Sequence, residues 1–521
     1  MFCVNCRKKF LILIPILVLA VGIIAISGTD FFKRTFYSPE KYFQYTMKKY
    51  VREESQMLAE WYGRLVKGDS DISDSSVSGE LTVRFGDEGI ELLESAAAFG
   101  DLDYLDDLAW LEQVSVATEF SVKDEIISGN LALKLGEDEL LSANSIADMA
   151  DETAYLQIPV LSDKYACVDL DEYLDELSYY MEDGDIIGYF ETLYACYPEK
   201  EEVERLLYKY GTLALSGIED VEKSRETLHA GDVDQKCTAL RTVIKSRTLR
   251  DISKAVLKEM KNDEELRRIM KNLSDLEGFD YLYDEYRDLL DEALDDAEDI
   301  DLYDDIVLTI YADNKGSIIG MQVKMGDDRF YCVGLQKGKN IGYEVVCDAD
   351  GVGFLLEGEG EESGGLINAD FVLETDSYYG SEEVEFRVEN FDKKAVRKGN
   401  VSGTVIFALE ELEDMLGIDG RFLRGYVLTV TLDMDEQSRN ADIRLMDDEE
   451  EVVSVGWNMK IDDGKEVSIP KKSDVIMIED ERDVSDWLDS VDTDRLIDHL
   501  KETALPRDIV YELEDILDWY M

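Results

Sequence analysis

The first hydrophobic pattern along the chain is an unbroken apolar run, Phe10–Ile26, with three basic residues, Arg7–Lys9, directly before it. At about 1.5 Å per residue such a run makes a helix of roughly 25 Å, close to the ~30 Å hydrocarbon core of a bilayer. Positive charge on a short flank favours the cytoplasmic side. We therefore predict a cytoplasmic flank at 1–9 and a transmembrane signal-anchor at 10–32. A signal peptide cleaved near Ser27 is the alternative.

The next pattern has helical spacing. Ser38 and Pro39 are a favourable N-cap and first helical residue, and apolar residues then recur along one helical face until Gly68. These residues are Phe43, Met47, Tyr50, Met57, Trp61 and Leu65. We predict a juxtamembrane helix over 38–68.

A period-two pattern follows, in which a Ser-Gly pair precedes alternating apolar residues. It occurs three times, at Ser78–Phe85, Ser128–Leu135 and Ser402–Leu409. Alternation of this kind is typical of half-buried antiparallel strands. The recurrence predicts two related sheet-forming units, at 77–169 and 305–475, with a central insertion between them.

Helical spacing dominates that insertion, 170–304, and returns in the C-terminal tail, 476–521. One alternating stretch inside the insertion, Cys237–Ile244, predicts a strand that rejoins the sheet. The predicted fold class is therefore α+β: an N-terminal transmembrane helix, curved antiparallel sheets, a mainly helical charged region and a helical tail.

The net charge of the chain limits the partners that it can bind. The chain has 118 acidic and 54 basic residues, a net charge of −64, yet is 45% hydrophobic. It therefore folds, because disorder requires low hydrophobicity as well as high charge. A surface this acidic repels phosphate backbones, which excludes nucleic acid as a partner.

The charge is unevenly distributed within the helical region. Residues 236–272 are rich in Lys and Arg, whereas 275–305 are almost purely acidic. We expect the two stretches to pair with each other on neighbouring helices. The alternative is an anionic partner docked on Arg247, Arg250, Lys254 and Lys258.

The cysteines beyond the apolar run are odd in number, which argues against a disulfide-built scaffold. They are Cys167, Cys196, Cys237, Cys332 and Cys347. A hairpin turning on Lys339-Asn340 would place Cys332 opposite Cys347. A cross-strand disulfide between these two is the predicted exception.

Motifs for catalysis are lacking in the sequence. The two histidines, His229 and His499, do not occur in a metal-ligand spacing, and no nucleophile elbow or phosphate-binding glycine loop is present. We predict no catalytic residue, no metal site and no cofactor. A hydrolase that works through paired carboxylates is a third hypothesis.

The layout resembles single-pass, membrane-anchored exported proteins of Gram-positive, clostridia-type bacteria. The resemblance is carried by Ser38–Tyr42 after the anchor, by the segment Glu139–Pro159 and by the helical tail. It implies a cell-envelope location and gives no information about activity. Strands that wrap around helices are also similar in architecture to the lipoprotein-carrier and lipid-binding lipoprotein superfamily, in which a curved antiparallel sheet shelters acyl chains.

These observations together favour a membrane-tethered, extracytoplasmic, non-enzymatic binding protein. Its expected partners are the membrane, through the N-terminal helix, and a lipid or other envelope component held in the curved sheet. A structural or adhesive surface protein without a ligand cavity is the alternative.

Overall fold

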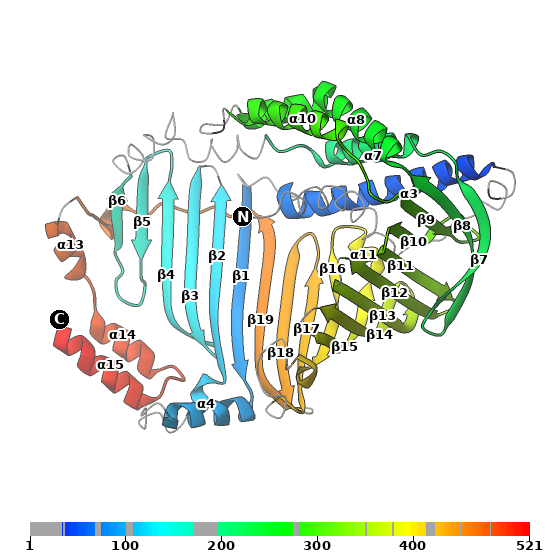
Figure 1. Ribbon diagram of the computed structural model, residues 1–521. Helices are drawn as coiled ribbons and strands as arrows, with labels where there is room; N and C mark the ends of the chain where they lie inside the picture. The colour runs from blue at the N-terminus through cyan, green and yellow to red at the C-terminus, as the bar shows by residue number, and fades with distance from the viewer. Residues whose placement is uncertain are drawn as a thin grey trace. The chain divides into compact units, whose positions relative to one another are not determined.

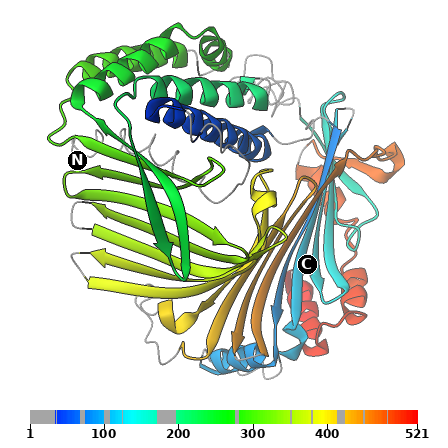
Figure 2. The ribbon, with the colours of Figure 1, turned by 90° about the vertical axis from the view of Figure 1, so that its right-hand side faces the viewer.

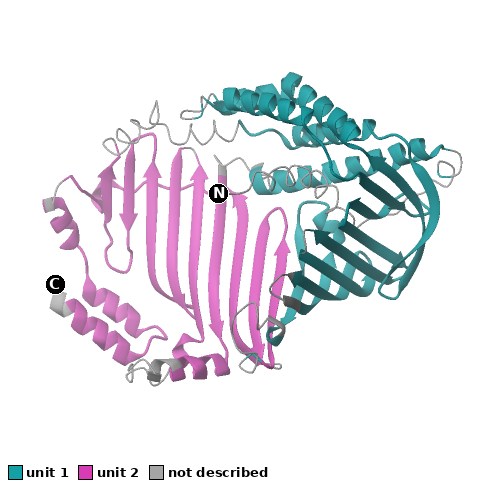
Figure 3. Cartoon of the chain, in the orientation of Figure 1, with its two compact units in different colours: residues 1–67, 193–423 teal, residues 68–192, 424–521 magenta. Residues whose placement is uncertain are grey.

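The computed structural model describes residues 34, 37–67, 74–99, 108–123, 125–170, 196–274, 279, 281–349, 352–377, 380–412, 423–447, 450–479 and 481–520. The chain forms two compact units (Figure 3). Unit 1 comprises Met1–Lys67 and Leu193–Leu423, and unit 2 comprises Gly68–Thr192 and Arg424–Met521. The predicted transmembrane segment at 10–32 lies outside the described residues. Within the described residues, no helix is both long and apolar enough to cross a membrane.

Unit 1 is built on an antiparallel meander in which each strand pairs with the next along the chain (Figure 1). Its strands are β7 (Glu222–Ala230), β8 (Val233–Ile244), β9 (Ile306–Ala312), β10 (Ile318–Met325), β11 (Asp328–Lys337), β12 (Asn340–Ala349), β13 (Val352–Ser363), β14 (Leu366–Ser377), β15 (Gly380–Asp392) and β16 (Val401–Ala408). The alternating stretch at 237–244 is therefore a strand, as predicted, and it pairs with β9.

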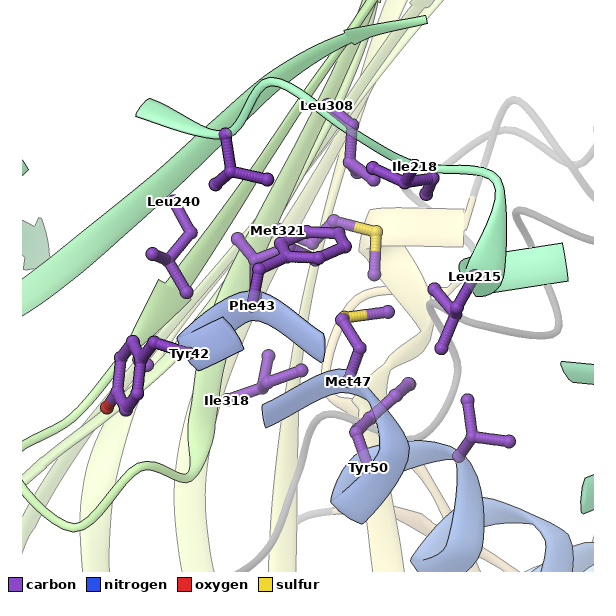
Figure 4. Close-up of a cluster of buried hydrophobic side chains, with 14 of the residues drawn as sticks. Tyr42, Phe43, Met47, Tyr50, Leu215, Ile218, Leu240, Leu308, Ile318 and Met321 are labelled. Carbon is purple, nitrogen blue, oxygen red and sulfur yellow. The ribbon is translucent and has the colours of Figure 1, made fainter. Parts of the chain in front are cut away.

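The helices of unit 1 are α3 (Pro39–Tyr62), α7 (Lys200–Ser216), α8 (Ser246–Asn262), α9 (Glu264–Ser274), α10 (Leu282–Glu298) and the short α11 (Lys393–Val396). The predicted start of α3 is confirmed, because the Ser38 hydroxyl accepts a hydrogen bond from the Lys41 N–H at 3.3 Å and Pro39 is the first helical residue. Tyr42, Phe43 and Met47 of α3 are fully buried against one face of the sheet (Figure 4).

The opposite face of β11 and β12 is covered by the β7–β8 hairpin, which crosses over these strands (Figure 2). Leu228 and Val233 of the hairpin pack with Tyr331 and Leu335 of β11. The backbones approach so closely that a Cβ atom on Gly342 would lie 2.0 Å from the Ala230 carbonyl oxygen. This end of the sheet is therefore buried on both faces.

A row of aromatic rings crosses unit 1 on the same face as α3. Register places Tyr343 opposite Gly358, Gly358 opposite Phe371, Phe371 opposite Phe386, and Phe386 opposite Phe407. The ring centroids of Tyr343 and Phe371 are only 5.9 Å apart, although their strands are separated by β13 and strands lie ~5 Å apart. The rings meet because Phe371 leans over Gly358, which has no side chain. Phe371–Phe386 and Phe386–Phe407 continue the row at 5.2 and 5.6 Å. We call these four rings the aromatic row.

Unit 2 is also built on a wide run of paired strands, in which β1 (Asp74–Phe85) lies between strands from both ends of the chain. It pairs with β2 on one side and with β19 on the other. The full order is β17 (Tyr426–Met434), β18 (Ser438–Asp447), β19 (Glu450–Asp463), β1, β2 (Gln113–Lys123), β3 (Ile126–Leu135), β4 (Asp138–Asp148), β5 (Thr153–Gln157), β6 (Tyr165–Asp169) and β20 (Val475–Met477). All neighbours are antiparallel except β6 and β20.

Helix α4 (Asp87–Phe99) and the tail helices α13 (Glu481–Leu488), α14 (Thr493–Lys501) and α15 (Arg507–Tyr520) complete unit 2. Ile497, Leu500 and Val510 of the tail pack with Leu140 of β4. The structure is thus α+β with large antiparallel sheets and a helical C-terminal tail, as predicted.

The grouping of strands differs from the expected one. We predicted a second sheet unit over 305–475, but β9–β16 belong to unit 1 while β17–β19 join β1 in unit 2. The three Ser-Gly segments all form strands, in β1, β3 and β16. Alternation of apolar and polar residues identifies a strand but not its partner. The pairing of β1 with β19, which is far away in the sequence, therefore could not be predicted from the local pattern.

The aromatic row predicts unequal costs for two glycine substitutions on the same strand. A Cβ atom on Gly358 would lie 2.3 Å from Phe371 Cε1, whereas one on Gly353 would meet its nearest atom, the Cys347 carbonyl oxygen, at 3.6 Å. Gly358→Ala should therefore lower the free energy of unfolding by about 1–3 kcal/mol through overpacking. Gly353→Ala should change it by less than about 1 kcal/mol. Urea unfolding measures both, and equal losses would contradict the packing of Phe371 over Gly358.

Candidate functional site

The register of unit 2 aligns apolar residues across the sheet. Leu81 of β1 lies opposite Trp457 of β19 and Val116 of β2. Val116 lies opposite Leu133 of β3, which in turn lies opposite Leu141 of β4. Because side chains alternate between faces, neighbouring rows two residues away share this face. We call the following set the apolar face: Leu81, Val83, Val116, Phe120, Leu131, Leu133, Leu141, Leu156, Ile443, Val455, Trp457 and Met459.

The apolar face is open in the described structure. Seven of its large side chains are exposed by between 38%, for Leu141, and 52%, for Leu131; the other five are Leu81, Phe120, Leu133, Leu156 and Ile443. Single exposed leucines are ordinary on protein surfaces, but a contiguous exposed apolar patch marks an interaction site. The patch also ends sharply, since Leu135, at the end of β3, is only 2% exposed.

Charge is excluded from the centre of this face. On β1, β2 and β3 the positions that share it carry only apolar residues, glycine, serine or threonine, although 33% of the chain is charged. A surface that faced only water would not need this exclusion. The composition matches an apolar ligand or partner surface.

The opposite face of the same sheet is polar and internally satisfied. Glu80 accepts hydrogen bonds from the Ser115 hydroxyl at 2.9 Å and from Lys134 Nζ at 3.3 Å. The Ser115 hydroxyl and then Lys134 lower the pKa of Glu80, although burial works in the opposite direction. Asn130 donates to Asn144 at 2.8 Å. The sheet is therefore strongly amphipathic, with its polar side suited to water.

The predicted disulfide between Cys332 and Cys347 is not formed, and both residues are free cysteines. The hairpin turns on Gly338-Lys339, one residue earlier than expected, so Cys332 lies opposite Val345 and Cys347 lies opposite Phe330. The two cysteines are diagonal rather than directly opposed, which is unfavourable for disulfide geometry. Burial raises the pKa of the Cys332 thiol to about 12.

Two of the four basic residues singled out on α8, Arg247 and Lys254, lie against acidic side chains. Lys254 forms an ion pair with Glu298 of α10 at 2.9 Å, and Arg250 donates to the Ile300 carbonyl oxygen at 2.8 Å. Arg247 lies 3.8 Å from Asp251 on its own helix. Lys258 is exposed, and together with Lys254 it lowers the pKa of Glu298. The expected pairing of the basic and acidic stretches is thus present between α8 and α10.

Both histidines have hydrogen-bonding partners. His229 Nδ1 lies 2.6 Å from Asp234 Oδ1, and His499 Nε2 lies 2.7 Å from the Glu139 carbonyl oxygen. In the part of the chain that the structure describes, no group of three or more His, Cys, Asp or Glu side chains is placed to hold a metal ion.

The residues of the apolar face were not predicted as a site. The alternation at Ser78–Phe85 and Ser128–Leu135 predicts strands with one apolar side, but it does not show whether that side is covered. Only the side-by-side register of strands from 77–157 and 430–459 shows how wide the face is. The absence of charge at alternate positions was the signal available in the sequence.

Comparison with known proteins does not assign the chain to a family. No protein-family model matches the chain, and no curated protein matches it.

The open face predicts unequal costs for two identical truncations on β3. Leu131→Ala removes a side chain that is 52% exposed, whereas Leu135→Ala, four residues later on the same face, removes one that is 2% exposed. We expect a loss below about 1 kcal/mol for Leu131→Ala and about 2–5 kcal/mol for Leu135→Ala. Chemical denaturation compares them. Similar losses would show that Leu131 is covered in solution.

Proposed function

We propose that this protein is a membrane-tethered, extracytoplasmic binding protein that holds the acyl chains of a lipid against the apolar face of unit 2 and catalyses no reaction. The observation that carries the proposal is the open, uncharged apolar face in a chain of net charge −64. The seven exposed side chains lie on β18 and on β1 to β5, so they form a broad surface.

The chemistry of the face favours acyl chains over a second copy of the protein. Two copies of a chain with net charge −64 repel each other at moderate ionic strength. An acyl chain brings no such charge to the face and needs no directional partner. Covering the exposed half of one leucine side chain contributes about 1 kcal/mol, so several covered together supply a useful binding free energy.

Two sequence features support the same proposal. The apolar run Phe10–Ile26 would hold the sheets beside a bilayer, which is a source of lipid. The resemblance in architecture to the lipid-binding lipoprotein superfamily agrees with an antiparallel sheet whose apolar side receives acyl chains. The exposed face is the main support.

Native mass spectrometry of the full-length chain, released from the membrane of the producing cell in a mild uncharged detergent, tests the proposal. We expect an additional bound mass that extracts into organic solvent as lipid. The triple variant Leu81→Gln, Leu131→Gln and Leu133→Gln should carry less of this mass than the unmodified chain, because it places amide groups where acyl chains would lie.

The matched control replaces three exposed leucines on helices, Leu92→Gln, Leu289→Gln and Leu488→Gln, and should keep the bound lipid. A bare polypeptide mass for the unmodified chain would contradict the proposal and favour a structural or adhesive role. Equal loss of lipid from both triple variants would contradict the assignment to the apolar face.

A further inference from the structure

Unit 1 contains a groove of about 510 Å³ on the face of its sheet that α3 also covers. Ile318, Ile341 and Tyr343 provide apolar lining. Polar residues of the β9–β10 turn, including Lys315, and of α11 with the following Arg397 form its rims. The groove is thus amphipathic, with apolar strand residues and charged rims.

The balance of charge in the groove is the reverse of that in the chain. Four basic residues line it, Lys315, Lys393, Lys394 and Arg397, against two acidic residues, Asp313 and Glu362. In the whole chain, 118 acidic residues face 54 basic ones. A locally basic groove in so acidic a protein is a place where positive potential is concentrated.

Both acidic residues are engaged by partners within or beside the groove. Glu362 Oε2 lies 2.7 Å from Lys393 Nζ, and both side chains are less than one-fifth exposed. Asp313 Oδ1 accepts hydrogen bonds from the backbone N–H groups of Lys315 and Ser317, each at 2.8 Å. These contacts fix both carboxylates in the framework of the groove. Glu362 is neutralised by Lys393, whereas Asp313 keeps its charge, so the four basic lining residues exceed the two acidic ones by two.

The remaining cations are positioned at the rim. Lys394 Nζ donates to the Gly364 carbonyl oxygen at 2.7 Å, which holds its ammonium group beside the β13–β14 turn. Arg397 interacts electrostatically with Glu53 and Glu54 of α3 and with Glu362, although burial lowers its pKa. Burial, and then the neighbouring Glu53, raises the pKa of Glu54 to about 7 even though Arg397 acts to lower it. Arg397 therefore has acidic neighbours, and Lys315 and Lys394 are the exposed cations of the groove.

Tyr343 connects this groove to the aromatic row. Its side chain lines the groove, and its ring centroid lies 5.9 Å from that of Phe371. The row continues on the same face through Phe386 and Phe407. An anionic group bound beside Lys315 and Lys394 would therefore have an apolar surface directly next to it.

We propose that the groove of unit 1 binds the acidic headgroup of an amphiphile whose chain extends along the aromatic row. This inference rests on the proposed lipid-binding function and goes beyond it, because it places a second lipid site in unit 1 and assigns its headgroup class: an anionic phosphate or carboxylate rather than a zwitterionic or uncharged group. The basic rims would attract the anionic headgroup of the amphiphile. Its acyl chain would lie against the aromatic rings.

Lipid competition on the full-length chain tests this inference. The protein, in dodecyl maltoside, is offered equal amounts of dioleoyl phosphatidate and dioleoyl phosphatidylcholine, which share acyl chains and differ in headgroup charge. Native mass spectrometry gives the ratio of the two bound lipids. We expect phosphatidate to be preferred by about tenfold, and added salt to reduce the preference.

The groove variant is Lys315→Gln with Lys394→Gln, both at exposed positions, so circular dichroism should show an unchanged fold. It should bring the ratio close to one. The control, Arg247→Gln with Lys258→Gln, removes two exposed positive charges from α8 and should leave the preference intact. Loss of preference in the control and not in the groove variant would assign the anionic site to α8 and overturn the inference.

Two further results separate this inference from the proposed function. Equal binding of both lipids by the unmodified chain would overturn the headgroup assignment while leaving lipid binding intact; binding of neither lipid would overturn both. Inorganic phosphate at 10 mM distinguishes free phosphate from a lipid headgroup. We expect it to leave most of the preference, and abolition would show that the groove is a site for free phosphate.

Discussion

The antiparallel register is the constraint on which the structure depends. In each sheet, every residue belongs to one face, and a shift of one residue in any pairing would exchange the two faces. The register aligns Leu81 with Trp457 and Val116, and places Glu80 on the other side with Ser115 and Lys134. A strongly acidic chain can therefore present an uncharged surface, because its charged and apolar residues are separated at the spacing of single residues.

The two units use this constraint differently. In unit 1, α3 covers one face and the β7–β8 hairpin covers part of the other, so that Phe43, Leu240 and Tyr331 are buried. The region beyond combines the charged rims of the basic groove with the half-buried rings of Phe371, Phe386 and Phe407. In unit 2 the described helices pack near the ends and edge of the sheet, and the apolar face carries seven exposed side chains. We interpret unit 2 as the broader acyl-chain surface and unit 1 as the part with a headgroup preference.

Much of the fold is visible in local sequence patterns. Ser38-Pro39 predicts the start of α3, Ser-Gly segments predict strands, and helical spacing predicts the C-terminal tail. What local patterns do not specify is which strands meet. The pairing of β1 with β19 depends on residues that are distant in sequence, and the expected disulfide fails because the hairpin turns one residue earlier than Lys339-Asn340. The basic groove likewise could not be predicted from the sequence, because Lys315 and Lys394 come together only through the meander.

Collisional quenching of Trp457 most directly tests the claim that the apolar face receives acyl chains. Trp457 lies in the central rows of that face, and a variant that keeps it while replacing the other four of the chain's five tryptophans with phenylalanine reports on this position alone. Lipids brominated along their acyl chains should quench its fluorescence strongly, while the same lipids without bromine should not. Unquenched Trp457 fluorescence in a sample shown by mass to carry brominated lipid would contradict the account.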